Sequence, residues 1–142
     1  MTPDGIDTTD WDQVHELAVE VVNTSADGDD TASDRASLRL RELLDHLQQK
    51  YGPLPSLLAT RADYVDRPED REYWLLAAHA EAEKRGDIKN LTLITESLAS
   101  FYIEERPDRE QGKRWLDALA QQAGLAEPGE VARLRTILDR QH

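Results

Sequence analysis

The sequence predicts an all-α protein built from antiparallel helical hairpins. Apolar residues recur every three to four positions along nearly the whole chain, and no stretch alternates polar and apolar residues as a strand does. Gly and Pro interrupt this pattern at short intervals, for example at Gly52-Pro53 and Gly86. Short breaks place successive helices antiparallel to each other. We therefore expect about seven helices in one domain that covers residues 10–142.

Two helices are expected in the first third of the chain, at about 10–23 and 34–51. Residues 24–31 combine a Gly with three Asp and other small polar residues, so we expect a loop between them. Residues 1–9 are polar and acidic, and we expect a flexible N-terminus. The apolar stripes of the two helices are Trp11, Val14, Ala18, Val21 and Val22, and Leu40, Leu43, Leu44, Leu47 and Tyr51.

Five more helices are expected from Leu54 onward, and the later four cover about 69–85, 88–104, 108–123 and 129–141. Arg67-Pro68 and Arg106-Pro107 separate helices because Pro disfavours a helical conformation of the residue before it. Gly86 and Gly124 favour helix ends. The stripe residues include Leu57, Leu58, Ala62, Trp74, Leu75, Ala78, Leu91, Ile94, Leu98, Phe101, Trp115, Leu116 and Leu119.

A Leu-Ala pair recurs at nearly constant spacing along the chain. The pairs are Leu17-Ala18, Leu58-Ala59 and Leu98-Ala99, which lie 41 and 40 residues apart. Such a period predicts three stacked hairpins, at about 10–52, 54–86 and 88–124. A stack leaves an apolar face at its end, and a last helix at 128–141 has the apolar residues to cap it.

The third hairpin resembles the tetratricopeptide repeat. Ala99 matches the small residue at which the two helices of that repeat cross, and Tyr102 matches the aromatic residue after it. Trp115 and Ala118 match the aromatic and small positions of the second helix. The resemblance covers about residues 54–124 and extends weakly to 10–52, with a generic helical bundle as the alternative.

The chain departs from this family pattern in places, and Ala62 stands where the next repeat has Tyr102. Gln111 stands where the family has Ala, unless the neighbouring Gly112 takes that role through a shifted loop. The resemblance implies a right-handed array whose concave face is lined by the first helix of each hairpin. It also implies a non-enzymatic protein–protein interaction module that binds a peptide or protein partner on this face.

The partner-binding positions of the family fall mostly on polar residues of this chain. Members that grip carboxylates have Lys, Arg and Asn there, whereas this chain has Asn23 and no basic residue. We therefore expect a partner that is not acidic, although the same residues also suit a merely solvated face. The positions are His15, Val19, Asn23, Ser56, Thr60, Asp63, Tyr64, Glu96, Ser100 and Glu104.

The charge of the chain excludes some classes of partner. The 17 basic and 29 acidic residues give a formal net charge of −12. Such a charge disfavours binding to nucleic acid and to anionic membranes. The longest apolar run, residues 73–78, is too short to cross a bilayer, and no secretory signal pattern is present, so we expect a cytoplasmic protein.

Asp and Arg dominate the charged residues, with 16 Asp and 13 Arg against only 4 Lys. A salt-rich cytoplasm favours this composition because a hydrated acidic surface keeps a protein soluble in salt. A GC-rich genome, which favours Arg codons over Lys codons, explains it equally well. Both interpretations stay open.

The residues offer little for catalysis or metal binding. The chain has no Cys and no Gly-rich phosphate loop. Asp12 with His15, and His79 with Glu83, share helix faces, but a di-metal bundle would repeat an acid-x-x-His motif on two helices. We expect no cofactor and no metal. The alternatives are a small helical bundle that binds a metal or small ligand, an acidic cognate inhibitor of the immunity type, and a homodimer formed through Trp11 or the last helix.

Overall fold

A computed structural model describes residues 2, 4–122 and 128–141 of the chain, and all regular structure in these residues is helical. The predicted all-α class is therefore confirmed. Seven α-helices and one π-helical segment follow one another in the described residues. They are α1 (Thr8–Ala26), α2 (Asp30–Tyr51), α3 (Pro55–Asp63), α4 (Pro68–Arg85), α5 (Ile88–Ser100), η1 (Phe101–Glu105), α6 (Arg109–Gln121) and α7 (Pro128–Arg140).

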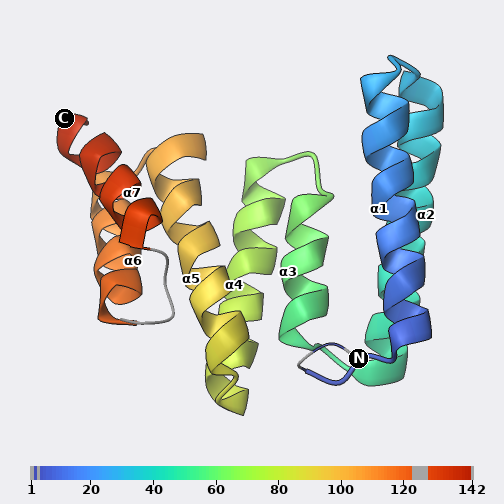
Figure 1. Cartoon of the computed structure of the whole chain (residues 1–142), viewed down its shortest axis with the longest axis horizontal. Coiled ribbons are helices and arrows are strands. Elements are labelled where there is room, and N and C mark those ends of the chain that lie inside the picture. The colour runs from blue at the N-terminus through green and yellow to red at the C-terminus, as the bar shows by residue number, and fades with distance from the viewer. Residues whose placement is uncertain (1, 3, 123–127, 142) are drawn as a thin grey trace.

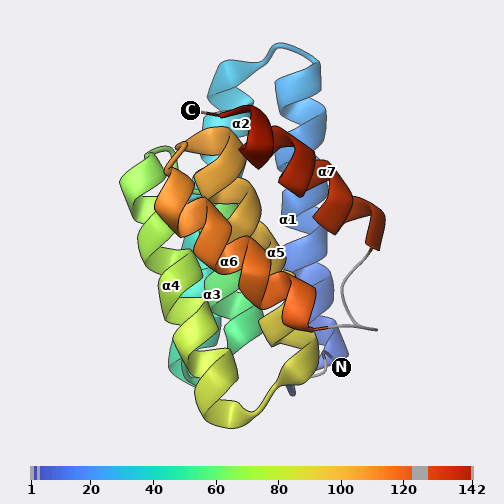
Figure 2. The same cartoon turned by 90° about the vertical axis from the view of Figure 1, so that its left-hand side faces the viewer.

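Neighbouring helices pack as antiparallel pairs in the order of the sequence. Helix α1 pairs with α2, α3 with α4, and α5 with α6, and α4 also contacts α5 (Figure 1). Helix α7 packs on α6 and η1 and buries Leu134 and Leu138. Figure 2 views this row of pairs from the α7 end, where α7 and α4 lie on opposite sides. The row of hairpins thus has two faces. One lies on the side of α5 and α7, and the other lies on the side of α4.

The buried apolar side chains form two clusters with no member in common. The main cluster lies between α3, α4, α5, η1, α6 and α7. The N-terminal cluster lies between α1, α2 and the start of α3. Helix α3 joins the two, since Leu57 belongs to the N-terminal cluster and Leu58 to the main cluster. The fully buried or nearly buried members of the N-terminal cluster are Ile6, Val14, Leu40, Leu44, Leu47, Leu54 and Leu57.

The prediction of a loop over residues 24–31 is wrong, because the connection is shorter. Helix α1 continues to Ala26 and α2 already begins at Asp30, so only residues 27–29 lie between them. The Asp29 carboxylate accepts a hydrogen bond from the Ala32 N–H at 3.0 Å and caps α2. Gly28 has a φ of 75°, which suits a tight turn. The Asp and Gly residues therefore form a cap and a short turn rather than a long loop.

Part of the N-terminal segment belongs to the packed structure, which the sequence pattern did not predict. Ile6 is fully buried in the N-terminal cluster. The Asp7 carboxylate accepts the Thr9 N–H at 2.8 Å and caps α1. The expected flexibility of residues 1–9 stays a prediction, and residues 1 and 3 lie outside the described residues.

The helix expected over residues 88–104 changes its hydrogen bonding near its end. After Ser100 it widens into η1, where the Arg106 N–H donates to the Phe101 carbonyl at 2.8 Å, five residues earlier. Gly112 of α6 is buried against this turn, and a Cβ atom there would lie 2.9 Å from Cγ1 of Ile103. Gly112, rather than Gln111, therefore occupies the close crossing with η1.

The substitution Gly112→Ala should lower the free energy of unfolding by about 1 kcal/mol. Alanine gains about 1 kcal/mol of helix propensity over glycine, but displacing a closely packed side chain costs about 1–3 kcal/mol. Ile103 is fully buried and has little room to move. Urea unfolding, followed by circular dichroism, measures the change.

The matched control is Gly129→Ala in α7, where a new Cβ would meet nothing within 4 Å. This variant should be as stable as the original chain or slightly more stable. If Gly112→Ala stabilised the protein as much as Gly129→Ala does, the close crossing would be refuted.

Candidate functional site

The structure places the ten predicted partner-binding residues in different surroundings. His15, Val19 and Asn23 are exposed along α1. The Ser56 hydroxyl donates to Asp4 at 2.8 Å, and the Thr60 hydroxyl donates to the Ser56 carbonyl at 2.8 Å. The two hydroxyls on α3 are therefore engaged within the chain, whereas the α1 side chains face solvent.

Three of the predicted residues meet in one pocket of about 240 Å³. Asp63 comes from the end of α3, and Glu96 and Ser100 come from α5. The pocket brings together side chains of α3 and α5 that the repeat spacing assigned to one face. The acidic pocket, as we call it, is completed by Arg71, Leu75, Ser97, Phe101, Glu105 and Glu130, none of which was predicted as a site residue.

The acidic pocket has an apolar floor and a negatively charged rim. Leu75 and Phe101 are almost fully buried, with 4% and 2% of their surface exposed. Four carboxylates, two serine side chains and a single guanidinium, that of Arg71, line the rest. Arg71 is already engaged, because its Nη1 lies 2.6 Å from a Glu105 oxygen and its Nε donates to the Ala62 carbonyl at 3.1 Å. The lining thus carries more carboxylates than guanidinium groups, with Glu105 paired to Arg71 and Glu130 paired to Arg133 from outside the lining.

Asp63 is a carboxylate of the pocket without a direct ion pair to a described residue. Among the described residues it has no ion-pair partner within 4.0 Å. Partial burial raises the pKa of Asp63, and the positive charge of Arg71 opposes this shift. A further cation in the pocket would stabilise the ionised form of Asp63.

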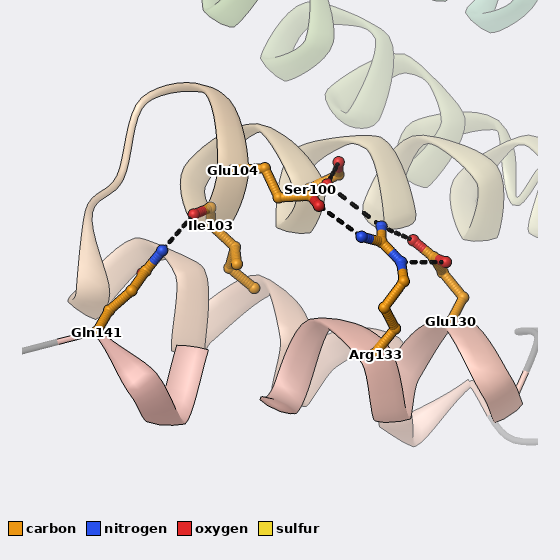
Figure 3. Close-up of polar contacts among 6 residues, drawn as sticks. All are labelled: Ser100, Ile103, Glu104, Glu130, Arg133 and Gln141. Carbon is orange, nitrogen blue, oxygen red and sulfur yellow. Dashed lines mark hydrogen bonds and ion pairs between the residues drawn. The ribbon is translucent and has the colours of Figure 1, made fainter. Parts of the chain in front are cut away.

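Glu104 faces α7 instead of the pocket (Figure 3). It accepts a hydrogen bond from the Ser100 hydroxyl at 2.8 Å and pairs with Arg133, which also lies 2.6 Å from Glu130. The contacts with Arg133 and Ser100 hold the pKa of Glu104 below its usual value. The Gln141 amide donates to the Ile103 carbonyl at 2.6 Å. These bonds attach α7 to η1 and fix the position of Glu130 at the pocket.

Tyr64, the remaining predicted residue, is partly buried and packs against the N-terminal cluster. Burial, and to a smaller extent the charge of Asp63, raises the pKa of its hydroxyl. Tyr64 thus has a packing role in the described structure in addition to its place beside Asp63.

A second pocket, of about 540 Å³, lies on the other side between α4 and α6. His79 and Trp115 line it, and their ring centroids are 4.7 Å apart in an edge-to-face arrangement. Burial lowers the pKa of His79, the charge of Glu83 opposes this shift, and Arg114 adds to it. The surroundings of His79 therefore favour the neutral imidazole.

The described residues offer no assembled metal site. Nowhere in residues 2, 4–122 and 128–141 do three or more His, Cys, Asp or Glu side chains gather so that they could hold a metal ion. In the same part of the chain, no helix is long and apolar enough to cross a membrane.

Comparisons with known proteins give one distant likeness. No protein-family model matches the chain, and no solved structure matches it. A protein of Archaeoglobus fulgidus described as a probable acetolactate synthase small subunit is 25% identical over 138 residues. The alignment covers 92% of this chain and 76% of that protein. A likeness at this identity does not assign the chain to a family.

The lowered pKa of His79 should make the free energy of unfolding depend on pH. Its pKa in the folded state lies below that in the unfolded state, which is about 6.5. As the pH falls below about 6.5, the unfolded chain therefore binds more protons than the folded chain does. The free energy of unfolding, which is highest above this pH, decreases as a result. Between pH 7.5 and 5, His79→Phe should reduce the pH dependence of the unfolding free energy, by at most about 1.4 kcal/mol per pH unit.

The control is His46→Gln, which changes an exposed histidine of α2. Urea unfolding at a series of pH values compares the two variants. An unchanged pH dependence in His79→Phe would contradict a pKa of His79 that burial lowers.

Proposed function

We propose that this chain is a non-enzymatic interaction module that binds a protein or peptide partner on the face of its odd-numbered helices. The hairpins form a tetratricopeptide-like, right-handed array in this proposal, with that face concave and α7 as the terminal cap. The observation that carries the proposal is the acidic pocket, in which three positions chosen from the family pattern meet. Its excess of carboxylates favours a basic side chain of the partner.

The pocket suits a long side chain with a cationic end. Lys and Arg bury their aliphatic stems on apolar surface and keep their charged ends near polar groups. Leu75 and Phe101 offer such an apolar floor, and Asp63 and Glu96 offer carboxylates at the rim. An arginine side chain has five N–H donors and could bond to carboxylate and hydroxyl groups together. We therefore favour arginine as the central residue of the partner segment.

The rest of the face adds exposed apolar side chains to these charges. Leu93 is 62% exposed and lies three residues before Glu96, on the same side of α5. On α1, Val19 and Val22 are 43% and 62% exposed. A partner that combines basic with apolar residues complements this surface best.

Two further considerations support a partner other than a second copy of this chain. A second copy would bring another net charge of −12, and like charges oppose association. The curated protein that resembles this chain is described as a small subunit, a term for a protein that assembles with another chain.

A capped peptide of alternating glycine and arginine, acetyl-GRGRGRGR-amide, should bind in a titration calorimeter at low ionic strength. The double substitution Asp63→Asn with Glu96→Gln should weaken this binding by about tenfold, since it removes two charge-assisted interactions. Circular dichroism checks that the variant remains folded.

The matched control removes the same amount of charge elsewhere, through Asp34→Asn with Asp139→Asn at two exposed positions. This control should bind the peptide nearly as well as the original chain. Equal weakening in the two double variants would refute the pocket as the site. Equal binding of a peptide with glutamate in place of arginine would refute a basic partner.

A further inference from the structure

A pocket of about 350 Å³ lies where the first hairpin meets the second. Leu38 of α2, Val65 before α4 and Trp74 of α4 give it apolar walls. Leu38 is 51% exposed, and Trp74 is partly buried against the main cluster. Sites for small molecules combine such walls with a few polar groups. This space, which we call the α2–α4 pocket, shares no lining residue with the acidic pocket.

One guanidinium in this lining is only partly compensated. Arg61 of α3 packs over the Trp74 ring, with 4.4 Å between its guanidinium carbon and the ring centroid. Its Nη2 forms an ion pair with Asp45, and only 17% of the Arg61 side chain is exposed. Nη1 of Arg61 is buried and has no hydrogen-bond partner among the described residues. Because a buried N–H group without an acceptor is unfavourable, Arg61 favours a ligand that brings an acceptor.

A second guanidinium of the lining is free of ion pairs. Arg41 of α2 has no carboxylate within 4.0 Å in the part of the chain that the structure describes. The two carboxylates of the lining are the exposed Glu42 and Asp45, and Asp45 is already paired with Arg61. Guanidinium groups thus equal carboxylates in number here, whereas the acidic pocket has four carboxylates and one guanidinium. The α2–α4 pocket therefore repels an anion less than the acidic pocket does.

We propose that the α2–α4 pocket binds a small monocarboxylate with an apolar body. The carboxylate lies between Arg41 and Arg61, whose planar arrays of N–H groups match its two oxygens. The apolar body packs against Leu38, Val65 and Trp74 and removes their surface from water. The carboxylate supplies the acceptor that Nη1 of Arg61 lacks, whereas an uncharged hydrocarbon would leave this group unpaired.

The size of the pocket favours a small molecule over a segment of another protein. Its volume of about 350 Å³ lies near the lower end of the range of about 300–1,000 Å³ that is usual for ligand pockets. The site lies outside the acidic pocket, and its ligand has the opposite charge to the basic partner proposed there. The inference therefore stands whether or not the face of the odd-numbered helices binds a partner.

The probe for this site is 3-phenylpropionate, which joins a phenyl ring to a carboxylate through a short chain. Nuclear magnetic resonance of the nitrogen-15-labelled full chain follows the amide shifts during the titration. We expect saturable shifts that centre on Leu38, Arg41 and Val65 and include the indole N–H of Trp74. The uncharged 3-phenylpropanamide should bind about tenfold more weakly, because it lacks the charge-assisted hydrogen bonds.

Two variants of α2 make the result specific. Arg41→Gln should weaken the binding of 3-phenylpropionate by about tenfold, since it removes one of the two guanidinium groups. The matched control is Arg39→Gln, which removes the same charge two residues away. Arg39 pairs with Glu20 of α1 and does not line the pocket, so this control should bind the probe as the original chain does.

Circular dichroism checks that both variants remain folded. Equal weakening in Arg41→Gln and Arg39→Gln would overturn the proposal, and so would equal affinities for 3-phenylpropionate and its amide. The absence of saturable shifts at the α2–α4 pocket would overturn it as well.

Discussion

The wide turn of η1, held against Gly112, is the constraint on which both the acidic pocket and the position of α7 depend. It lets consecutive glutamates reach different helices, since Glu104 pairs with Arg133 of α7 and Glu105 pairs with Arg71 of α4. It also leaves the Ile103 carbonyl accessible to Gln141 near the end of the chain. A side chain at residue 112 would push this turn away from α6 and disturb all of these contacts.

The large negative charge of the chain has different effects in different places. Several carboxylates are compensated within the fold, such as Asp10, which lies 2.8 Å from Lys50, and Glu72, which accepts a hydrogen bond from Tyr102 at 2.6 Å. Others cap helices, as Asp29 and Asp87 do. The acidic pocket differs from these because its carboxylates outnumber the single guanidinium that lines it. We therefore propose the pocket, rather than the net charge, as the source of partner preference.

The fold class and the pairing of helices could be predicted from the sequence because apolar periodicity and Gly or Pro breaks are local signals. The sequence offers Gln111 and Gly112 as alternatives for the close crossing. The hydrogen bonding of η1 decides between them, and this bonding depends on tertiary packing. For the site, the repeat spacing placed Asp63, Glu96 and Ser100 on one face. It could not indicate Arg71 or Glu130, since these come from α4 and α7 and reach the pocket only through the stacking of helices. The hydrogen bond from the Ser56 N–H to Asp4 has no sequence signature, because its donor and acceptor lie 52 residues apart.

We propose that the face of the odd-numbered helices, and within it the acidic pocket, receives a basic partner segment. Nuclear magnetic resonance of the nitrogen-15-labelled chain tests it most directly, with the glycine–arginine peptide added in steps and the backbone amide shifts followed. We expect saturable shifts that centre on Asp63, Glu96, Ser97 and Ser100, which line the pocket. Saturable shifts that centre instead on Leu76, His79 and Ala80, at the pocket between α4 and α6, would contradict it.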